Sequence, residues 1–190
     1  MQTSPNPIEL LNRKINLPEI HNIVNWVLSS PDNIDTIFRL VKSPDTRTAT
    51  NALWILTHVQ KQDRTLLQSK QPELIDMLLA ENHTGKKRML LQLLREQTYT
   101  CDTIRPDFLD FCFAKINAEC EPYAIRAFSI YCAFKMCRFY PELTTELEQH
   151  LDMLSLQNPS PGLLSALRTT RKRIKSTKQH HSTPHKHYQY

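Results

Sequence analysis

Glycine is almost absent from this chain. Only Gly85 and Gly162 occur among its 190 residues, whereas glycine makes up about 7% of typical proteins. Phosphate-binding loops and dinucleotide-binding turns need several glycines, because their backbone adopts positive φ and approaches the ligand closely. The composition therefore excludes a P-loop and a G-x-G-x-x-G site. Tight Asn-Gly and Asp-Gly hairpins are absent as well, so the sequence predicts an all-α protein.

The cysteines form no disulfide or metal-binding pattern. There are five, Cys101, Cys112, Cys120, Cys132 and Cys137, and no two are spaced C-x-x-C. Most lie in apolar helical stretches, where a free cysteine behaves as a small hydrophobic residue. The N-terminal sequence lacks the basic and apolar regions of a signal peptide, and no apolar run approaches the roughly 18 residues of a membrane span. We therefore expect reduced thiols and a cytoplasmic protein.

Charge is distributed unevenly along the chain. The net charge is +5, but residues 1–162 carry 17 basic and 19 acidic residues, a balance of −2. Residues 163–190 carry seven basic residues and no acidic one, a balance of +7. Any binding of nucleic acid by long-range electrostatics is therefore expected to depend on the C-terminal end.

Proline marks a repeating helix start. Six of the twelve prolines precede an acidic residue, at positions 18, 31, 44, 72, 106 and 141. Proline suits the first position of a helix because its φ is preset and its missing N–H would be unpaired there anyway, and an acidic neighbour meets the positive end of the helix dipole. The pattern predicts a leading helix near 18–29 and first helices near 31–42, 72–81, 106–117 and 141–155. Second helices are predicted near 44–61, 85–98, 121–140 and 160–179.

Arginines repeat at the same interval. Arg47, Arg88 and Arg126 stand near the starts of the predicted second helices, and Arg168 follows later in the last one. Helix pairs that recur about every 40 residues indicate a HEAT or armadillo-type solenoid. The segment 43–54, Ser-Pro-Asp-Thr-Arg-Thr-Ala-Thr-Asn-Ala-Leu-Trp, resembles the HEAT pattern of a turn, an arginine and small residues before Ala-Leu. The chain as a whole resembles the small HEAT-like repeat proteins common in Bacteroidetes.

The resemblance implies a right-handed α-α superhelix of about four HEAT-like helix pairs plus an N-terminal helix. We predict a flexible segment at 1–17, a repeat domain at 18–179 and a disordered His-rich tail at 180–190. Histidine-rich tracts can bind transition metals weakly, but a polar end without apolar periodicity favours disorder. No metal and no cofactor are predicted.

In such a solenoid one face of each second helix lines the concave surface. At 100° per residue, Arg47, Asn51, Trp54 and His58 share the face opposite Ala49, Ala52 and Leu56. The same spacing predicts binding positions in the later helices, at Arg88, Gln92, Arg95, Tyr99, Arg126, Arg168, Lys172 and Lys175. In helix 121–140 the equivalents Ile130, Ala133 and Cys137 are apolar, so that face is either covered, by a terminus for example, or carries an apolar patch for a partner.

Structural roles compete with these binding roles. A HEAT arginine near the start of a second helix is more often a structural ladder residue than a ligand contact, and Trp54 can pack against the following repeat instead of facing solvent. Basic residues also suit a helix C-terminus. Against this, matching offsets in several helices are hard to attribute to chance, and Arg, Trp and Tyr commonly anchor interfaces.

No catalytic motif is found. H-E-x-x-H, G-x-S-x-G and paired-carboxylate patterns are absent, and an adenylosuccinate lyase activity is not supported, because the chain is short and lacks that enzyme's Gly- and Ser-rich loop. The sequence favours a non-enzymatic scaffold that binds a protein or peptide through its concave face. The alternative is a nucleic-acid-binding protein related to the HEAT-like DNA alkylation-repair glycosylases, with weak binding expected. No membrane partner is predicted.

Overall fold

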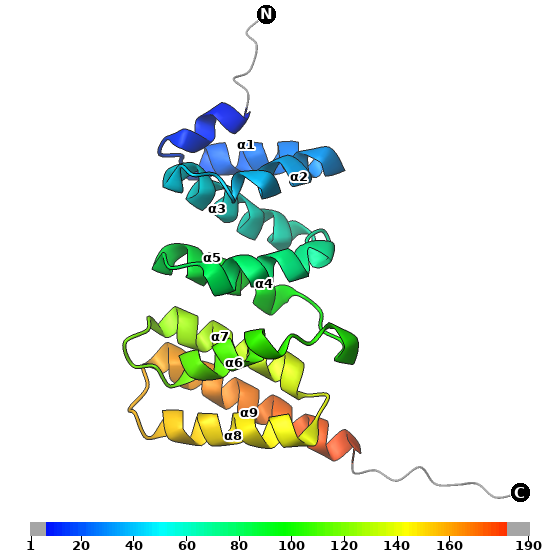
Figure 1. The fold of residues 1–190 in the computed structure, drawn as a ribbon, viewed down its shortest axis with the longest axis vertical. Coiled ribbons are helices and arrows are strands. Elements are labelled where there is room, and N and C mark those ends of the chain that lie inside the picture. The colour runs from blue at the N-terminus through cyan, green and yellow to red at the C-terminus, as the bar shows by residue number, and fades with distance from the viewer. Residues whose placement is uncertain (1–6, 182–190) are drawn as a thin grey trace, which may run out of the picture. The chain divides into compact units, whose positions relative to one another are not determined.

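The computed structural model describes residues 7–181, and within this part every regular element is helical (Figure 1). A short 3-10 helix, η1 (Pro7–Asn12), and helix α1 (Leu17–Leu28) come first. Two kinds of helix then alternate along the chain. The first helices are α2 (Pro31–Leu40), α4 (Gln71–Ala80), α6 (Pro106–Ile116) and α8 (Pro141–Ser155), and the second helices are α3 (Thr46–Gln62), α5 (Thr84–Glu96), α7 (Tyr123–Cys137) and α9 (Pro161–His181).

The predicted all-α fold, with one helix ahead of four helix pairs, is confirmed. The largest errors lie at the ends of α7, which is shorter than the predicted 121–140. Two further 3-10 helices, η2 (Gln68–Lys70) and η3 (Cys101–Thr103), were not predicted. These single turns are too short to show a hydrophobic period.

Proline begins the first helices as expected. Pro31, Pro106 and Pro141 are the first residues of α2, α6 and α8, and each is followed by an acidic residue in the first turn. Helix α3 begins differently, because Pro44 lies outside it and Asp45 is the N-cap. The Asp45 carboxylate accepts hydrogen bonds from the backbone N–H and the hydroxyl of Thr48, at 2.8 and 2.5 Å, and these bonds hold the pKa of Asp45 below its usual value.

Residues 1–97 form the first of two compact units. Helix α3 lies at its centre and contacts η1, α1, α2 and α5, while α4 packs on α5. Ten residues of α3 are buried. Beyond the first turn, a single stripe of α3 stays accessible to solvent, at Thr50, Trp54, His58 and Lys61.

The prediction of a flexible segment at 1–17 is wrong for residues 7–17. Leu11 and Ile15 are buried, at 0% and 5% exposure. The side-chain amide of Asn51, on α3, donates to the backbone carbonyls of Leu11 and Arg13, at 2.8 and 2.9 Å. The segment is therefore held by core packing and by hydrogen bonds that local sequence patterns do not reveal, and residues 1–6 lie outside the described part of the chain.

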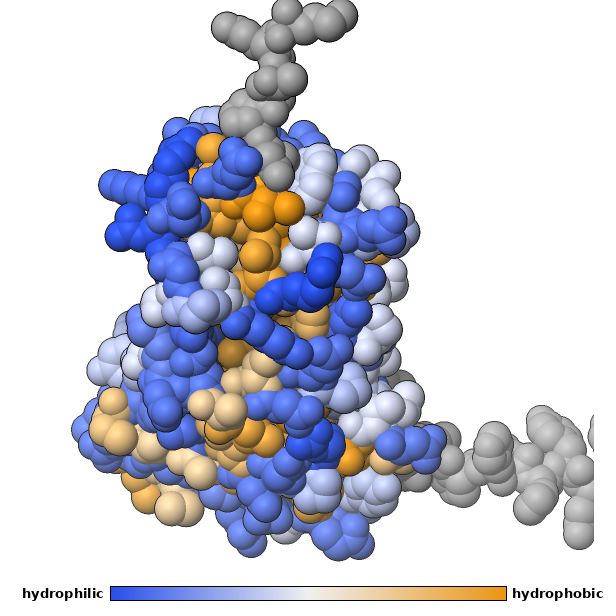
Figure 2. Space-filling model, turned by 45° about the horizontal axis from the view of Figure 1, so that its top comes forward, coloured by the Kyte–Doolittle hydropathy of each residue, from blue (hydrophilic) through white to orange (hydrophobic). Residues whose placement is uncertain are grey.

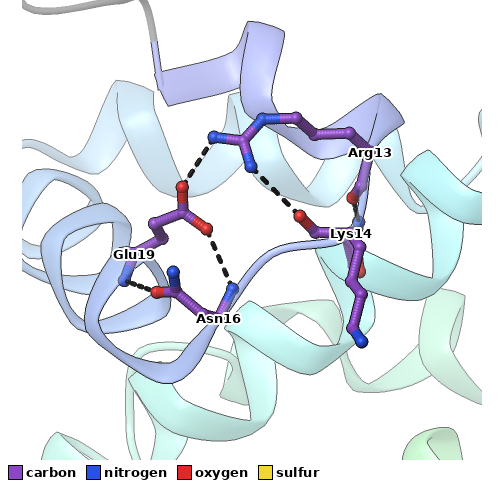
Figure 3. A network of polar contacts seen from close by, with 5 residues as sticks. Arg13, Lys14, Asn16 and Glu19 are labelled. Atoms are coloured by element: carbon purple, nitrogen blue, oxygen red, sulfur yellow. Dashed lines mark hydrogen bonds and ion pairs between the residues drawn. The ribbon is translucent and has the colours of Figure 1, made fainter.

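Polar contacts also fix the start of α1 (Figure 3). Asn16 and Glu19 form a reciprocal capping box, in which each side chain accepts from the other residue's backbone N–H at 2.9 Å. Arg13 adds an ion pair to Glu19 at 2.6 Å and donates to the carbonyl of Lys14. These contacts lower the pKa of Glu19, mainly through the hydrogen bond from Arg13.

Residues 98–190 form the second unit. Helix α7 lies at its centre and contacts α6, α8 and α9. Helix α9 continues to His181, two residues past the predicted domain end at 179. The remaining part of the predicted His-rich tail, 182–190, lies outside the described residues.

We expect Asn51→Ala to lower the free energy of unfolding by about 2 kcal/mol, because it leaves two carbonyls of the N-terminal segment without their donor. Chemical denaturation measures the change. Asn22→Ala, at an exposed position of α1, is the control and should change stability by less than about 0.5 kcal/mol. Equal effects of the two substitutions would contradict the assigned role of Asn51.

Candidate binding faces

The accessible stripe of α3 contains three of its four predicted residues. Arg47 is exposed, and Trp54 and His58 are half-buried. Asn51 is the exception, since it is only 9% exposed and holds the N-terminal segment. The prediction that Asn51 lies in a surface stripe is wrong, because η1 covers that side of α3.

Trp54 and His58 form an aromatic cluster on this stripe. Their ring centroids are 5.9 Å apart, with the planes at 76°, and His21 from α1 lies 6.3 Å from the His58 ring. The His58 Nδ1 atom is 3.0 Å from the carbonyl oxygen of Trp54, which fixes the orientation of the imidazole. The cluster offers one side of an indole ring to solvent.

Helix α5 places a second stripe beside it. Arg88 is exposed, and Gln92 and Arg95 are half-buried. A polar hollow of about 200 Å³ lies between α3 and α5, lined by Thr57, Gln60, Lys61, Arg64, Gln92, Arg95 and Glu96. We call the accessible residues of these two helices the unit-1 face: Arg47, Trp54, His58, Lys61, Arg88, Gln92 and Arg95.

Glu96 partly neutralises the cations of this hollow. Its carboxylate accepts from the Arg95 Nε at 2.9 Å and pairs with Arg64 at 3.6 Å. Below them, the Gln60 side chain donates to the buried carbonyl of Leu93 at 3.0 Å and joins α3 to α5. Apolar surface in unit 1 lies elsewhere, with Leu17 and Leu28 of α1 exposed at 50% and 38%. Figure 2 shows hydrophobic residues gathered around the N-terminal end of this unit.

Tyr99 is not a surface residue. It lies beyond the end of α5, in the second unit, and is 1% exposed. Its ring stacks on Phe108 of α6 with the centroids 6.4 Å apart. The predicted stripe assumed that α5 continued to residue 98, but the helix ends at Glu96.

Arg126 is also buried, at 3% exposure. Its Nε donates to the carbonyl of Ile116 at 3.0 Å, and its Nη2 forms a short hydrogen bond to the side chain of Gln157. Gln157 in turn donates to the carbonyl of Asn117 at 3.2 Å. This arginine therefore ties the α6–α7 and α8–α9 connections together and cannot contact a ligand, as the structural alternative for HEAT arginines predicted.

The accessible stripe of α7 lies one or two residues further along the helix than the predicted one. Ile130, Ala133 and Cys137 are fully buried, so that face is covered rather than open to a partner. Half-buried positions instead follow Phe128, Tyr131 and Lys135. No sequence pattern signals this shift, because the apolar residues of α7 are spread around its whole circumference.

Helix α9 carries the predicted basic residues on its exposed side. Arg168, Lys172 and Lys175 are exposed, and Leu163, Leu167 and Ile174 are buried on the opposite side. A shallow hollow is lined by Arg168, Arg171, Lys172, Lys175 and Ser176. The unit-2 face is defined as the accessible residues of α7 and α9: Phe128, Tyr131, Lys135, Arg168, Lys172 and Lys175.

A small apolar pocket lies apart from this face in the second unit. Its volume is about 140 Å³, and its lining residues come from α7, α8, α9 and the α7–α8 connection: Phe134, Arg138, Phe139, Pro141, Thr144, Ile174, Thr177 and Lys178. Arg138 lies over the Phe139 ring at 4.8 Å.

Three of the five cysteines are placed for packing, while Cys101 and Cys120 are exposed. Cys112, Cys132 and Cys137 are fully buried. Burial raises the pKa of the Cys137 thiol to about 12 and also raises that of Cys112, which lies beside Cys132. Thiols held protonated are poor nucleophiles and poor metal ligands. Among the side chains of residues 8–178, no group of three His, Cys, Asp or Glu is arranged to hold a metal ion.

Helices that pair around two central second helices, each with an accessible stripe, define a helical repeat protein. The profile of the HEAT repeat domain matches residues 8–177, and the chain belongs to this family. No curated protein and no solved structure matches it. The narrower resemblance to repeat proteins of Bacteroidetes stays a prediction. None of the described helices has the length and apolar character needed to cross a membrane.

Trp54 should be partly accessible to a neutral quencher, because one side of its indole faces solvent. In a Trp26→Phe variant, which leaves Trp54 as the only tryptophan, acrylamide should quench the emission to a degree between those of the native core and the denatured chain. Emission that is blue-shifted and fully protected would contradict this placement.

Stability should fall in mild acid because of His150. Its ring stacks on Phe113 with the centroids 4.6 Å apart, and burial lowers its pKa, an effect that nearby Glu146 partly opposes. As the pH falls through about 6.5, the unfolded chain takes up this proton before the folded protein does. The contribution of neutral His150 to the free energy of unfolding is therefore fully present above about pH 6.5 and is lost as the pH falls toward the lower pKa of the folded state.

Urea denaturation between neutral pH and pH 5 measures this dependence. His150→Gln should flatten it, whereas His21→Gln, at an exposed position of α1, should leave it unchanged. An identical pH profile for the wild type and His150→Gln would rule out His150 as the source.

Proposed function

We propose that this HEAT repeat protein is a non-enzymatic scaffold and that its unit-1 face binds a protein or peptide partner. The carrying observation is the half-buried Trp54, with His58 beside it and Arg47, Lys61 and Arg88 on the same face. Interface hot spots are enriched in Trp, Tyr and Arg, and they lie where a ring is already partly packed and loses its remaining water on binding. The expected cytoplasmic location is consistent with free thiols at all five cysteines.

The polar hollow between α3 and α5 supports the same function. Gln92 and Arg95 can donate to backbone carbonyls or carboxylates of a bound segment, while Trp54 covers its apolar side chains. A rigid helical frame lowers the entropy cost of binding, because these side chains are already partly ordered. No step of a chemical reaction is assigned to these residues.

A nucleic-acid partner is the second candidate, and the unit-2 face favours it. Arg168, Lys172 and Lys175 are exposed on one side of α9, and rows of cations can follow a phosphate backbone. Sequence-independent binding of this kind weakens steeply with salt. The expected affinity is low, because the dense row occupies only one helix.

Capture of the partner from the native cytoplasm tests the leading proposal. A Trp54→Ala, Arg95→Ala double variant should lose the captured protein, since truncation of a hot-spot side chain costs about 2 kcal/mol or more, roughly a thirtyfold loss of affinity. Trp26→Ala with Arg39→Ala removes the same residue types from α1 and α2 and should retain it. Circular dichroism verifies that both variants are folded. Equal capture by the wild type and the Trp54 variant refutes the assignment of this face.

A further inference from the structure

Charge is segregated between the first and second helices. In unit 1, α2 and α4 carry four acidic and one basic residue, whereas α3 and α5 carry one acidic and six basic residues. In unit 2, α6 and α8 carry six acidic and one basic residue, whereas α7 and α9 carry eight basic residues and no acidic one. The net charge of residues 1–162 is therefore near neutral because the negative first helices and the positive second helices offset each other.

Pairing within the chain leaves much of this positive charge uncompensated. Arg171 and Lys178 of α9 do pair with Asp152 and Glu148 of α8. In α5, Lys86 pairs with Glu81 and Arg95 with Glu96. Five further cations of the second helices are exposed and form no ion pair with any residue that the structure describes: Lys61, Arg88, Arg168, Lys172 and Lys175. Clustered charges of one sign raise the local potential and attract ligands of the opposite sign.

Half-buried aromatic rings accompany these cations. Trp54 lies between Arg47 and Lys61 on the accessible stripe of α3, and Tyr131 and Phe128 lie on that of α7. His58 approaches the Trp54 ring edge-on, and both rings are partly packed. Sequence-tolerant nucleic-acid binding stacks bases on open ring faces, whereas a partly packed ring is better suited to contact an aliphatic or aromatic side chain.

We infer that the partner of the unit-1 face is an acidic protein segment, whose carboxylates meet Lys61 and Arg88 while an apolar side chain covers Trp54. The inference rests on the proposed function and narrows its partner. Glu96 favours a peptide over a phosphate chain. A peptide can present a backbone N–H to this carboxylate in the α3–α5 hollow and keep its own carboxylates away from it, whereas every unit of a phosphate chain carries a charge that Glu96 repels. Sparse cations separated by Gln92 and His58 also fit scattered carboxylates better than a continuous polyanion.

Fluorescence anisotropy with three probes tests this inference on the full-length protein. The probes are a labelled Glu-rich peptide with leucines at helical spacing, the same peptide with Gln in place of every Glu, and a single-stranded oligonucleotide of the same formal charge. The Glu-rich peptide should bind, the Gln peptide should not, and the Glu-rich affinity should fall as salt rises. At physiological salt the oligonucleotide should bind more weakly than the Glu-rich peptide.

Charge reversal locates the surface. Lys61→Glu with Arg88→Glu should weaken binding of the Glu-rich peptide roughly tenfold or more, because each attraction becomes a repulsion. Lys14→Glu with Arg39→Glu makes the same change of net charge at exposed positions outside the second helices and should weaken it less than about twofold. Equal losses in both variants, or equal binding of the Glu and Gln peptides, overturn the inference. Tighter binding of the oligonucleotide at physiological salt also overturns it and favours a nucleic-acid partner.

The two proposals fail separately. If a cytoplasmic partner is captured through Trp54 but no Glu-rich peptide binds, the scaffold function stands and the acidic character of the partner is refuted. The opposite result is that Lys61→Glu with Arg88→Glu abolishes peptide binding while Trp54→Ala with Arg95→Ala does not affect capture. That result supports the acidic specificity and refutes the Trp54-centred interface.

Discussion

Burial of a second helix on three of its faces is the constraint on which the rest of each unit depends. Helix α3 is enclosed by η1, α1, α2 and α5, and α7 by α6, α8 and α9. A helix surrounded in this way needs apolar or hydrogen-bonded side chains over most of its circumference. One stripe is left for polar residues, and any partner that binds a central helix must contact that stripe.

The same enclosure explains why two of the predicted binding residues serve the fold. Asn51 satisfies two carbonyls of the N-terminal segment, and Arg126 satisfies a carbonyl at the end of α6 and the side chain of Gln157. Helix ends leave carbonyls without intrahelical partners, and a polar side chain from the central helix supplies the missing donors. Polar residues at this place in a repeat therefore do not by themselves indicate a ligand.

The charge pattern connects fold and function. Acidic residues suit the beginnings of the first helices, where they meet the positive end of the dipole, and they account for part of the negative charge of α2, α4, α6 and α8. Dipole effects favour Lys61, Arg95 and Lys135 in the last turns of their helices. They do not explain Arg47 and Arg88, which lie near the beginnings of α3 and α5. The proposed recognition of an acidic partner gives these arginines a role that helix stability does not.

The sequence by itself determined the helices, because proline, acidic neighbours and apolar periodicity are local signals that act within one helix. It also identified Trp54, His58, Arg88 and Lys172 as accessible, since their helices have one clearly polar side. Only the tertiary structure decided that Asn51, Tyr99 and Arg126 are buried, and which stripe of α7 is accessible. Each of these depends on which segment, distant in sequence, covers a helix, as η1 covers α3. In α7 the apolar residues are spread around the helix, so their pattern does not indicate where the neighbouring helices pack.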